Sequence, residues 1–249
     1  MNRHLWTRNI TKSSCPMWQC PHCRKGVVTI KAKSLQFEET VESRRLHSDP
    51  EFDADWVKHA FTAWGKCSNS QCGQAFAIAG EGGVSPEYTS DEGDWEYEEY
   101  FVPKYCFPMP HIIDIPRRCP DEIKIQLTQA FSLFWSDRPA CAGRIRVSLE
   151  GLMNYLGVPK KRKSRSGGFN ELTLHARIDA YAEKYPQVGA QLMALKWLGN
   201  TGSHENEVSR IDILDAFDIL EHALVEVLEK RTERVEELTK RLVKKHARK

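Results

Sequence analysis

The sequence predicts a mainly α protein, in which an antiparallel helical bundle follows a small β-rich module. Four of the eight cysteines stand in two close pairs near the N-terminus, on either side of a β-rich stretch. From about residue 119 onward, apolar residues recur at the three- and four-residue spacing of amphipathic helices. Between these regions, residues 81–99 hold eight acidic residues and no Lys or Arg, which is typical of a solvated connection.

Length and composition indicate a folded chain that dissolves in water. The 249 residues suffice for one large domain or two smaller ones, and 41% hydrophobic residues support a real core. There is no run of about 18 apolar residues, and residues 1–12 are polar without a hydrophobic signal core. We therefore expect a cytoplasmic protein with no membrane partner.

The paired cysteines predict a metal site. In a chain without a secretory signal, cysteines usually serve as metal ligands or free thiols and rarely form disulfides. A gap of two residues from Cys20 to Cys23, and a second short turn from Cys67 to Cys72, can point four thiolates at one ion. Cys20, Cys23, Cys67 and Cys72 thus predict a zinc ribbon. The zinc is expected to be structural, because four thiolates leave no position open for water.

Alternatives remain around this site. Cys15 competes with Cys20 as a ligand, and we prefer Cys20 because Cys-Pro-x-Cys-x-x-Gly is the better metal-binding turn. His22 lies inside the turn, where we expect its side chain to point outward. Residues 53–60 carry helical cues within the insertion that separates the two pairs.

The C-terminal half carries the signals of five helices. Gly157 and the pair Gly199–Asn200 are typical helix ends, and Asp212 follows Ser209 at the spacing of a capping box. Arg146 and Glu150 form an i,i+4 pair on the second helix. The helices are expected to begin near Pro120, Pro139, Asn170, Pro186 and Ser209.

These patterns divide the chain into four segments. Residues 1–80 are expected to form the zinc ribbon with a helical insertion, and residues 81–118 an acidic and then proline-rich linker. Residues 119–229 are expected to form the helical bundle. Residues 230–249, with nine basic and three acidic residues, are expected to extend the last helix as a basic tail.

Three motifs in the helical half carry a resemblance. They are residues 146–150 (Arg-Val-Ser-Leu-Glu), residues 174–179 (Leu-His-Ala-Arg-Ile-Asp) and residues 198–204 (Leu-Gly-Asn-Thr-Gly-Ser-His). Together they resemble domain of unknown function 4145, a branch of the HEPN superfamily. The resemblance covers about residues 100–229, and the cysteine module is similar to N-terminal extensions of relatives.

The resemblance implies a homodimeric, HEPN-like bundle with a composite, metal-independent RNA-cleaving site. In HEPN ribonucleases an arginine, a following polar residue and a histidine form that site. Here Asn200 matches the polar residue and His204 the histidine, while Gly199 stands at the arginine position. Since a cation stabilises charge on the phosphate in the transition state, Lys196 or Arg146 would have to replace the arginine.

Nucleic acid is the partner that the charge pattern suggests. The cluster of Lys160, Lys161, Arg162, Lys163 and Arg165 can grip a phosphate backbone or remain a solvated turn.

Two classes of function follow. The first is a prokaryotic RNA-cleaving effector of defence against phage or foreign nucleic acid, with RNA or DNA and a partner protein of a defence system as candidate partners. The second is a non-catalytic adaptor that binds nucleic acid or protein through the zinc ribbon and a dimeric helical domain.

Overall fold

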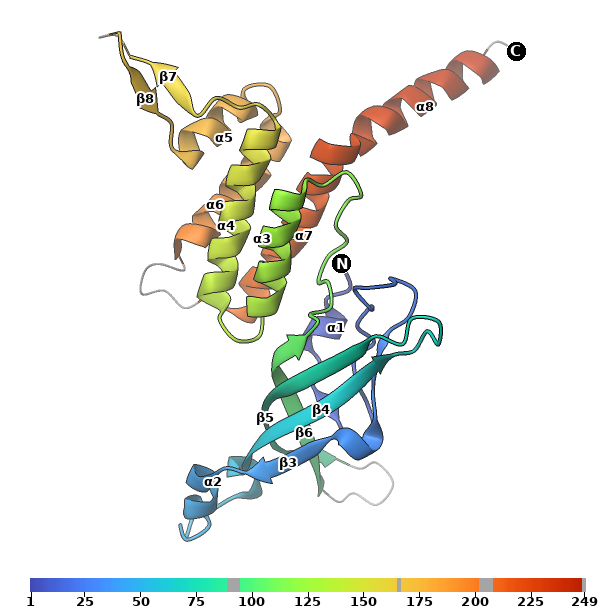
Figure 1. Cartoon of the computed structure of the whole chain (residues 1–249), viewed down its shortest axis with the longest axis vertical. Coiled ribbons are helices and arrows are strands. Elements are labelled where there is room, and N and C mark those ends of the chain that lie inside the picture. The colour runs from blue at the N-terminus through green and yellow to red at the C-terminus, as the bar shows by residue number, and fades with distance from the viewer. Residues whose placement is uncertain (89–94, 165–166, 202–207, 248–249) are drawn as a thin grey trace. The chain divides into compact units, whose positions relative to one another are not determined.

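The chain forms two compact units, residues 2–111 and residues 112–249. The computed structural model describes residues 1–88, 95–164, 167–201 and 208–247 (Figure 1). No helix in the described part of the chain is both long and apolar enough to span a lipid bilayer. Each unit has its own buried core, and each is described separately below.

The N-terminal unit is built on a curled antiparallel sheet of six strands (Figure 1). The strands pair in the order β1-β6-β5-β4-β2, and β3 pairs with β4 outside this path. Short helices α1 (His4–Thr7) and α2 (Val41–Leu46) accompany the sheet. The strands are β1 (Ile10–Thr11), β2 (Val28–Ile30), β3 (Gln36–Glu39), β4 (Lys58–Cys67), β5 (Ala75–Tyr88) and β6 (Trp95–Phe107).

The expectation of a mainly α protein was wrong, because the large sheet makes the fold mixed α/β. Most of the residues expected to form an acidic linker lie in β5 and β6, which pair along most of their length. Glycine in this stretch allows the close approach of neighbouring strands. A Cβ at Gly82 would lie 2.6 Å from the carbonyl oxygen of Tyr100. Aromatic residues in β6, which favour strands, take the place of most aliphatic side chains there.

Strand β4 shows how the sheet buries one face. Its side chains alternate strictly between exposed and buried, as the period of two in a β-strand requires. Phe61 on β4 packs against Phe101 on β6, with ring centroids 5.2 Å apart. The helical cues in residues 53–60 correspond only to a 3-10 turn, Ala54–Trp56, before β4 begins.

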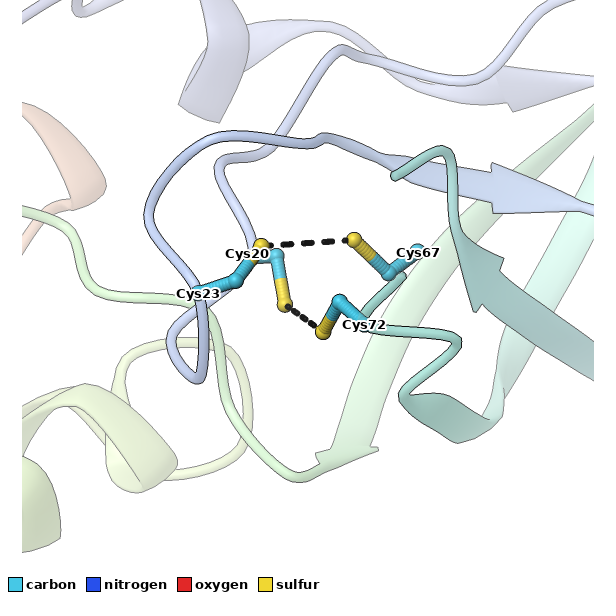
Figure 2. Close-up of side chains that lie close together, drawn as sticks. All are labelled: Cys20, Cys23, Cys67 and Cys72. Atoms are coloured by element: carbon cyan, nitrogen blue, oxygen red, sulfur yellow. Dashed lines mark hydrogen bonds between the residues drawn. The ribbon is translucent and has the colours of Figure 1, made fainter. Parts of the chain in front are cut away.

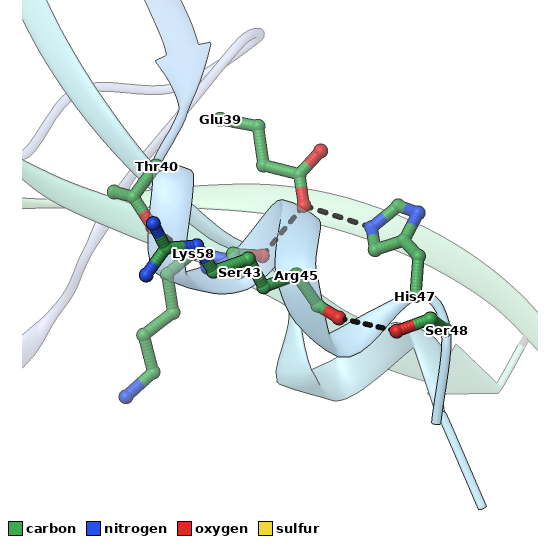
Figure 3. A network of polar contacts seen from close by, with 7 residues as sticks. All are labelled: Glu39, Thr40, Ser43, Arg45, His47, Ser48 and Lys58. Atoms are coloured by element: carbon green, nitrogen blue, oxygen red, sulfur yellow. Dashed lines mark hydrogen bonds and ion pairs between the residues drawn. The ribbon is translucent and has the colours of Figure 1, made fainter. Parts of the chain in front are cut away.

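Helix α2 is fixed to the sheet by a polar network (Figure 3). The hydroxyl of Ser43 donates to Glu39 Oε1 at 2.6 Å and accepts the backbone N–H of Lys58 at 3.0 Å. His47 Nε2 lies 2.8 Å from the same Glu39 oxygen. The hydrogen bond from Ser43 lowers the pKa of Glu39. These bonds join α2 to both β3 and β4.

The C-terminal unit is a bundle of helices with a short β-hairpin (Figure 1). Contacts join α3 to α4, α4 to α6, α5 to α6 and α6 to α7. Its core holds Phe131 and Phe217, with ring centroids 5.4 Å apart. The elements are α3 (Asp121–Leu133), α4 (Arg138–Tyr155), β7 (Lys161–Lys163), β8 (Phe169–Glu171), α5 (Leu174–Ala182), α6 (Pro186–Thr201), α7 (Arg210–Glu229) and α8 (Arg231–His246).

Several predicted helix boundaries are confirmed, and the caps explain them. Pro120 precedes α3, and Gly157 follows α4 with φ +69°. Ser209 and Asp212 form the predicted capping box of α7, because each side chain accepts a hydrogen bond from the other's backbone N–H.

Other boundaries differ from the expectation. Asn170 lies in β8, so α5 begins only at Leu174, where the side chain of Thr173 caps it. Helix α6 continues through Gly199 and Asn200 to Thr201. The tail does not extend α7 directly, since Lys230 adopts a left-handed conformation with φ 49° and α8 begins after it.

Candidate metal centre and candidate active site

The four predicted cysteines lie together in the N-terminal unit (Figure 2). Their sulfur atoms all lie within 4.8 Å of one another. Cys20 Sγ is 3.9 Å from Cys72 Sγ, and Cys23 Sγ is 3.6 Å from Cys67 Sγ. A tetrahedral ion with metal–sulfur bonds of about 2.3 Å holds its sulfurs about 3.8 Å apart. The cluster can therefore hold one metal ion.

The first cysteine turn favours a thiolate. Arg24, directly after Cys23, has φ 53°, which folds the chain back toward the sulfur. The backbone N–H of Gly26 donates to Cys23 Sγ at 3.4 Å. Hydrogen bonds from the backbone of Gly26 and Lys25 lower the pKa of Cys23 to about 6. A thiolate is the form of cysteine that binds a metal.

Sheet pairing brings the second turn to the first. Val28 of β2 pairs with Cys67 at the end of β4, so the two turns lie at the same end of these strands. Gly26 makes this approach possible, because a Cβ there would lie 2.5 Å from Cys67 Sγ. After Cys72, Gly73 has φ +60°, a conformation that suits glycine.

Cys20, and not Cys15, belongs to the cluster. The Cys15 thiol instead contacts the carbonyl oxygen of Pro16 at 3.5 Å, and burial raises its pKa to about 12. The expectation that His22 is exposed rather than a ligand is confirmed, since the clustered ligand atoms do not include its ring. Its Nδ1 lies 3.5 Å from Cys72 Sγ although the residue is exposed, so His22 borders the cluster.

In the helical unit, the structure brings Arg146 of α4 against Gly199 of α6. A Cβ at Gly199 would lie 2.5 Å from Arg146 Cβ and 3.2 Å from Arg146 Cδ. The space that a side chain at position 199 would need is thus filled by the arginine from α4. Arg146 also forms the predicted pair with Glu150, with Nη1 3.4 Å from Oε1. Its buried Nε has no hydrogen-bond partner among the described residues.

Lys196, the other candidate cation, is buried and has partners. Its Nζ lies 3.2 Å from His175 Nδ1 and 3.3 Å from the ring centroid of Trp197. His175 Nε2 lies 3.2 Å from Asp179 Oδ2, which completes a chain of polar contacts across α5 and α6. Lys196 is therefore held at the contact between these helices.

The structure describes only some of the other motif residues. Asn200 lies in the last turn of α6 and is partly exposed. His204, the predicted catalytic histidine, lies outside the residues that the structure describes. Arg177, from the second motif, is buried and donates from Nη2 to Asn154 Oδ1 and to the carbonyl oxygen of Val158, both at 2.9 Å. Arg177 thus ties α5 to the C-terminal part of α4 and the segment that follows.

The predicted nucleic-acid-binding cluster lies on the hairpin β7–β8. Lys161, Arg162 and Lys163 form β7, and all three are exposed. Lys160, just before it, is also exposed, whereas Arg165 lies outside the described residues. Lys161 Nζ is 3.7 Å from Glu171 Oε1, whereas Lys160, Arg162 and Lys163 form no ion pair within the described residues.

Sequence reasoning missed two contacts that shape these sites. The contact of Gly26 with Cys67 follows from the pairing of β2 with β4, which no local pattern predicts. The contact of His175 with Lys196 joins two helices. A sequence signal for His175 did exist, since His175 and Asp179 stand at i,i+4 inside one of the quoted motifs.

The fold and the cysteine cluster define a two-unit protein with a candidate metal site on a sheet and a separate helical unit. Residues 128–245 match the family model Domain of unknown function (DUF4145), so the chain is similar to the family that its motifs suggested. Residues 8–106 match a second model, Domain of unknown function (DUF8608). No curated protein and no solved structure matches the chain.

Proposed function

We propose that this protein is an RNA-directed effector, in which the N-terminal unit holds a structural zinc ion and a HEPN-like helical unit cleaves RNA without a metal. The observation that carries the catalytic part is the contact of Arg146 with Gly199. The resemblance expects an arginine at the position of Gly199. Arg146 of α4, whose side chain contacts Gly199, is the arginine that takes this role in the proposal.

Zinc is the ion that best suits four thiolates at these distances. Tetrahedral sulfur coordination favours zinc or iron–sulfur chemistry, and two short cysteine turns on strands are typical of structural zinc sites. Four protein ligands leave no open position, so an ion here supplies folding energy rather than catalysis. Cys20, Cys23, Cys67 and Cys72 would hold it.

In the proposed reaction each residue has a distinct role. Arg146 stabilises negative charge on the phosphate through its guanidinium, since its side chain is 36% exposed. Asn200 orients the ribose or the phosphate, and His204 exchanges the proton as general base or acid. Lys196 has a secondary role, because its ammonium group already contacts His175 and the ring of Trp197.

The nucleophile in this proposal is the ribose 2′-hydroxyl. Its oxygen bonds to the adjacent phosphorus, its proton passes to the base, and the bond from phosphorus to the 5′-oxygen breaks as that oxygen gains a proton. The products are a 2′,3′-cyclic phosphate and a 5′-hydroxyl end. A DNA strand has no 2′-hydroxyl and cannot follow this path.

The first test is cleavage by the full-length protein. We expect single-stranded or structured RNA to be cut in the presence of EDTA, and the matching 2′-deoxy strand to stay intact. His204→Ala should abolish cleavage and keep the zinc content and the unfolding temperature of the wild type. If the wild-type protein leaves every RNA intact, the catalytic proposal fails.

The same assay separates the alternative, a nucleic-acid-binding adaptor without catalysis. The exposed cations of β7 favour this second candidate. An adaptor would bind RNA with an affinity that falls steeply with salt, because phosphate contacts release counterions. It would leave the RNA uncut, and Gln in place of Lys161, Arg162 and Lys163 would flatten the salt dependence.

The proposal includes a homodimer. Helix α8 exposes Val235, Leu238 and Leu242 by 53%, 38% and 55%, in the heptad spacing of a self-pairing helix. We expect the wild-type protein to sediment as a dimer at micromolar concentration and Leu238→Glu with Leu242→Glu to weaken the dimer. A wild-type protein that sediments as a monomer at that concentration would remove the dimer from the proposal.

Defence against phage is the biological setting that the resemblance implies. We expect cells that express the wild-type protein to lower phage plating relative to cells that express His204→Ala. Equal plating in the two strains would argue against this setting.

A further inference from the structure

One face of the sheet in the N-terminal unit exposes three aromatic side chains. Trp64 on β4 is 57% exposed, and on β6 Tyr105 and Phe107 are 66% and 79% exposed. The residues before and after Trp64, and Cys106 between the other two, are buried. The three aromatic rings therefore belong to the face of the sheet that lies opposite the core.

The register of the strands places small alanine side chains between these rings. Trp64 pairs with Ala77, which pairs with Phe107, while Tyr105 pairs with Ala79. Paired residues of antiparallel strands present their side chains on the same face. Strands β4 and β6 lie on either side of β5, about 10 Å apart at the usual strand spacing. Small alanine side chains thus separate Trp64 from the two rings on β6.

Three lysines lie on or beside the strands that carry these rings. Lys66 follows Trp64 by two residues on β4 and pairs with Ala75. The backbone N–H of Lys31 donates to the carbonyl oxygen of Trp64 at 3.0 Å, which places that exposed lysine at the edge of the face. Lys104 precedes Tyr105 and forms an ion pair with Glu81 at 2.7 Å. Lys31 and Lys66 form no ion pair with an acidic residue in the part of the chain that the structure describes.

We propose that Trp64, Tyr105 and Phe107 form a platform that binds single-stranded nucleic acid by base stacking. Exposed aromatic side chains on a sheet stack two or three bases, and neighbouring lysines bind the phosphates. The small side chains of Ala77 and Ala79 leave room for bases beside the rings. Nucleic acid fits this face better than an apolar protein segment does, because the lysines lie next to the rings.

The proposed function gives the exposed face of the N-terminal sheet no role. Nucleic-acid binding is the role that we infer for it. Cleavage was argued entirely from residues of the helical unit, whereas the platform lies in the N-terminal unit. The inference rests on the proposed function only for the choice of RNA as the natural strand. Stacking does not need a 2′-hydroxyl, so a DNA strand of the same sequence is a valid probe of binding.

The test measures binding alone, by fluorescence anisotropy of a labelled single-stranded DNA of mixed sequence with the full-length His204→Ala protein. Cleavage cannot interfere, because this strand lacks the 2′-hydroxyl. We expect Trp64→Ala, Tyr105→Ala and Phe107→Ala each to weaken binding about 5- to 150-fold, the factor usual for loss of one stacked base. Trp64→Phe should retain most of the affinity.

Tyr97→Ala is the matched control. Tyr97 lies on the same strand and is 51% exposed, but it shares its side of β6 with the buried Phe101. This variant should bind as the unmodified protein does. All variants should keep their zinc content and unfolding temperature, since the replaced side chains are exposed.

Two outcomes would overturn the platform. One is a triple alanine variant at Trp64, Tyr105 and Phe107 that binds the strand with unchanged affinity. The other is a protein that binds no single strand, DNA or RNA, which would assign the face to a protein partner. Loss of the platform would leave the cleavage proposal standing, and loss of cleavage would leave the platform standing, because the two assays share no readout.

Discussion

Removal of the metal is expected to unfold the N-terminal unit and to leave the helical unit folded. The two cysteine turns meet at the ends of β2 and β4, where Cys20 and Cys67 are buried. Without an ion, four sulfurs that share one small space lose the interaction that holds the turns together. The helical unit has a separate core and no part in the cluster.

Elemental analysis and hydrogen exchange test this expectation together. The purified protein should hold about one zinc per chain, and a strong chelator should raise amide exchange in β2 and β4 while α3 and α4 stay protected. Cys23→Ser with Cys67→Ser should lose the zinc and show the same exchange pattern without a chelator.

Cys15→Ser is the matched control, since its thiol is partly buried yet lies outside the cluster. It should retain the full zinc content. A wild-type protein without zinc, or a double variant that keeps it, would contradict the metal site.

Replacement of Arg146 is expected to cost about 10²- to 10³-fold in the rate of RNA cleavage, as loss of one transition-state donor does in other enzymes. Arg146→Lys should recover part of the rate, since it keeps the charge and loses the fork of donors. Arg146→Gln should lose nearly all of it. Single-turnover rates at saturating RNA measure the chemical step apart from binding.

Arg144→Gln gives the comparison for these variants. Arg144 lies on the same helix, is exposed, and donates to Gln126 Oε1 at 3.2 Å, away from the Gly199 contact. It should leave the cleavage rate unchanged. If Arg146→Gln cleaves as fast as Arg144→Gln, the cation of the site is not Arg146, and Lys196→Met becomes the next variant to measure.

Local patterns in the sequence predicted the parts of the fold that local chemistry determines. The spacing of Cys20 to Cys23 and of Cys67 to Cys72 was enough to find the cluster, because each pair sits in its own turn. The capping box at Ser209 and the stop at Gly157 were equally local. Motif resemblance identified the helical half, which the family match supports.

The sheet could not be predicted in the same way, because its evidence lies in pairing between distant residues. Gly82 and the acidic residues near it resemble a linker until β6 is placed beside β5. The contact of Arg146 with Gly199 depends on the packing of α4 against α6, and no spacing within either helix indicates it. The aromatic face likewise appears only once the register of β4, β5 and β6 is known.

Mass spectrometry of the RNA ends after incubation with the full-length protein in EDTA tests the central claim most directly. The proposed reaction predicts fragments that end in a 2′,3′-cyclic phosphate or its hydrolysis product, paired with fragments that begin with a 5′-hydroxyl. These fragments should be absent with His204→Ala and strongly reduced with Arg146→Gln. Intact RNA in all samples, or fragments with 5′-phosphate ends, would contradict metal-independent cleavage by this site.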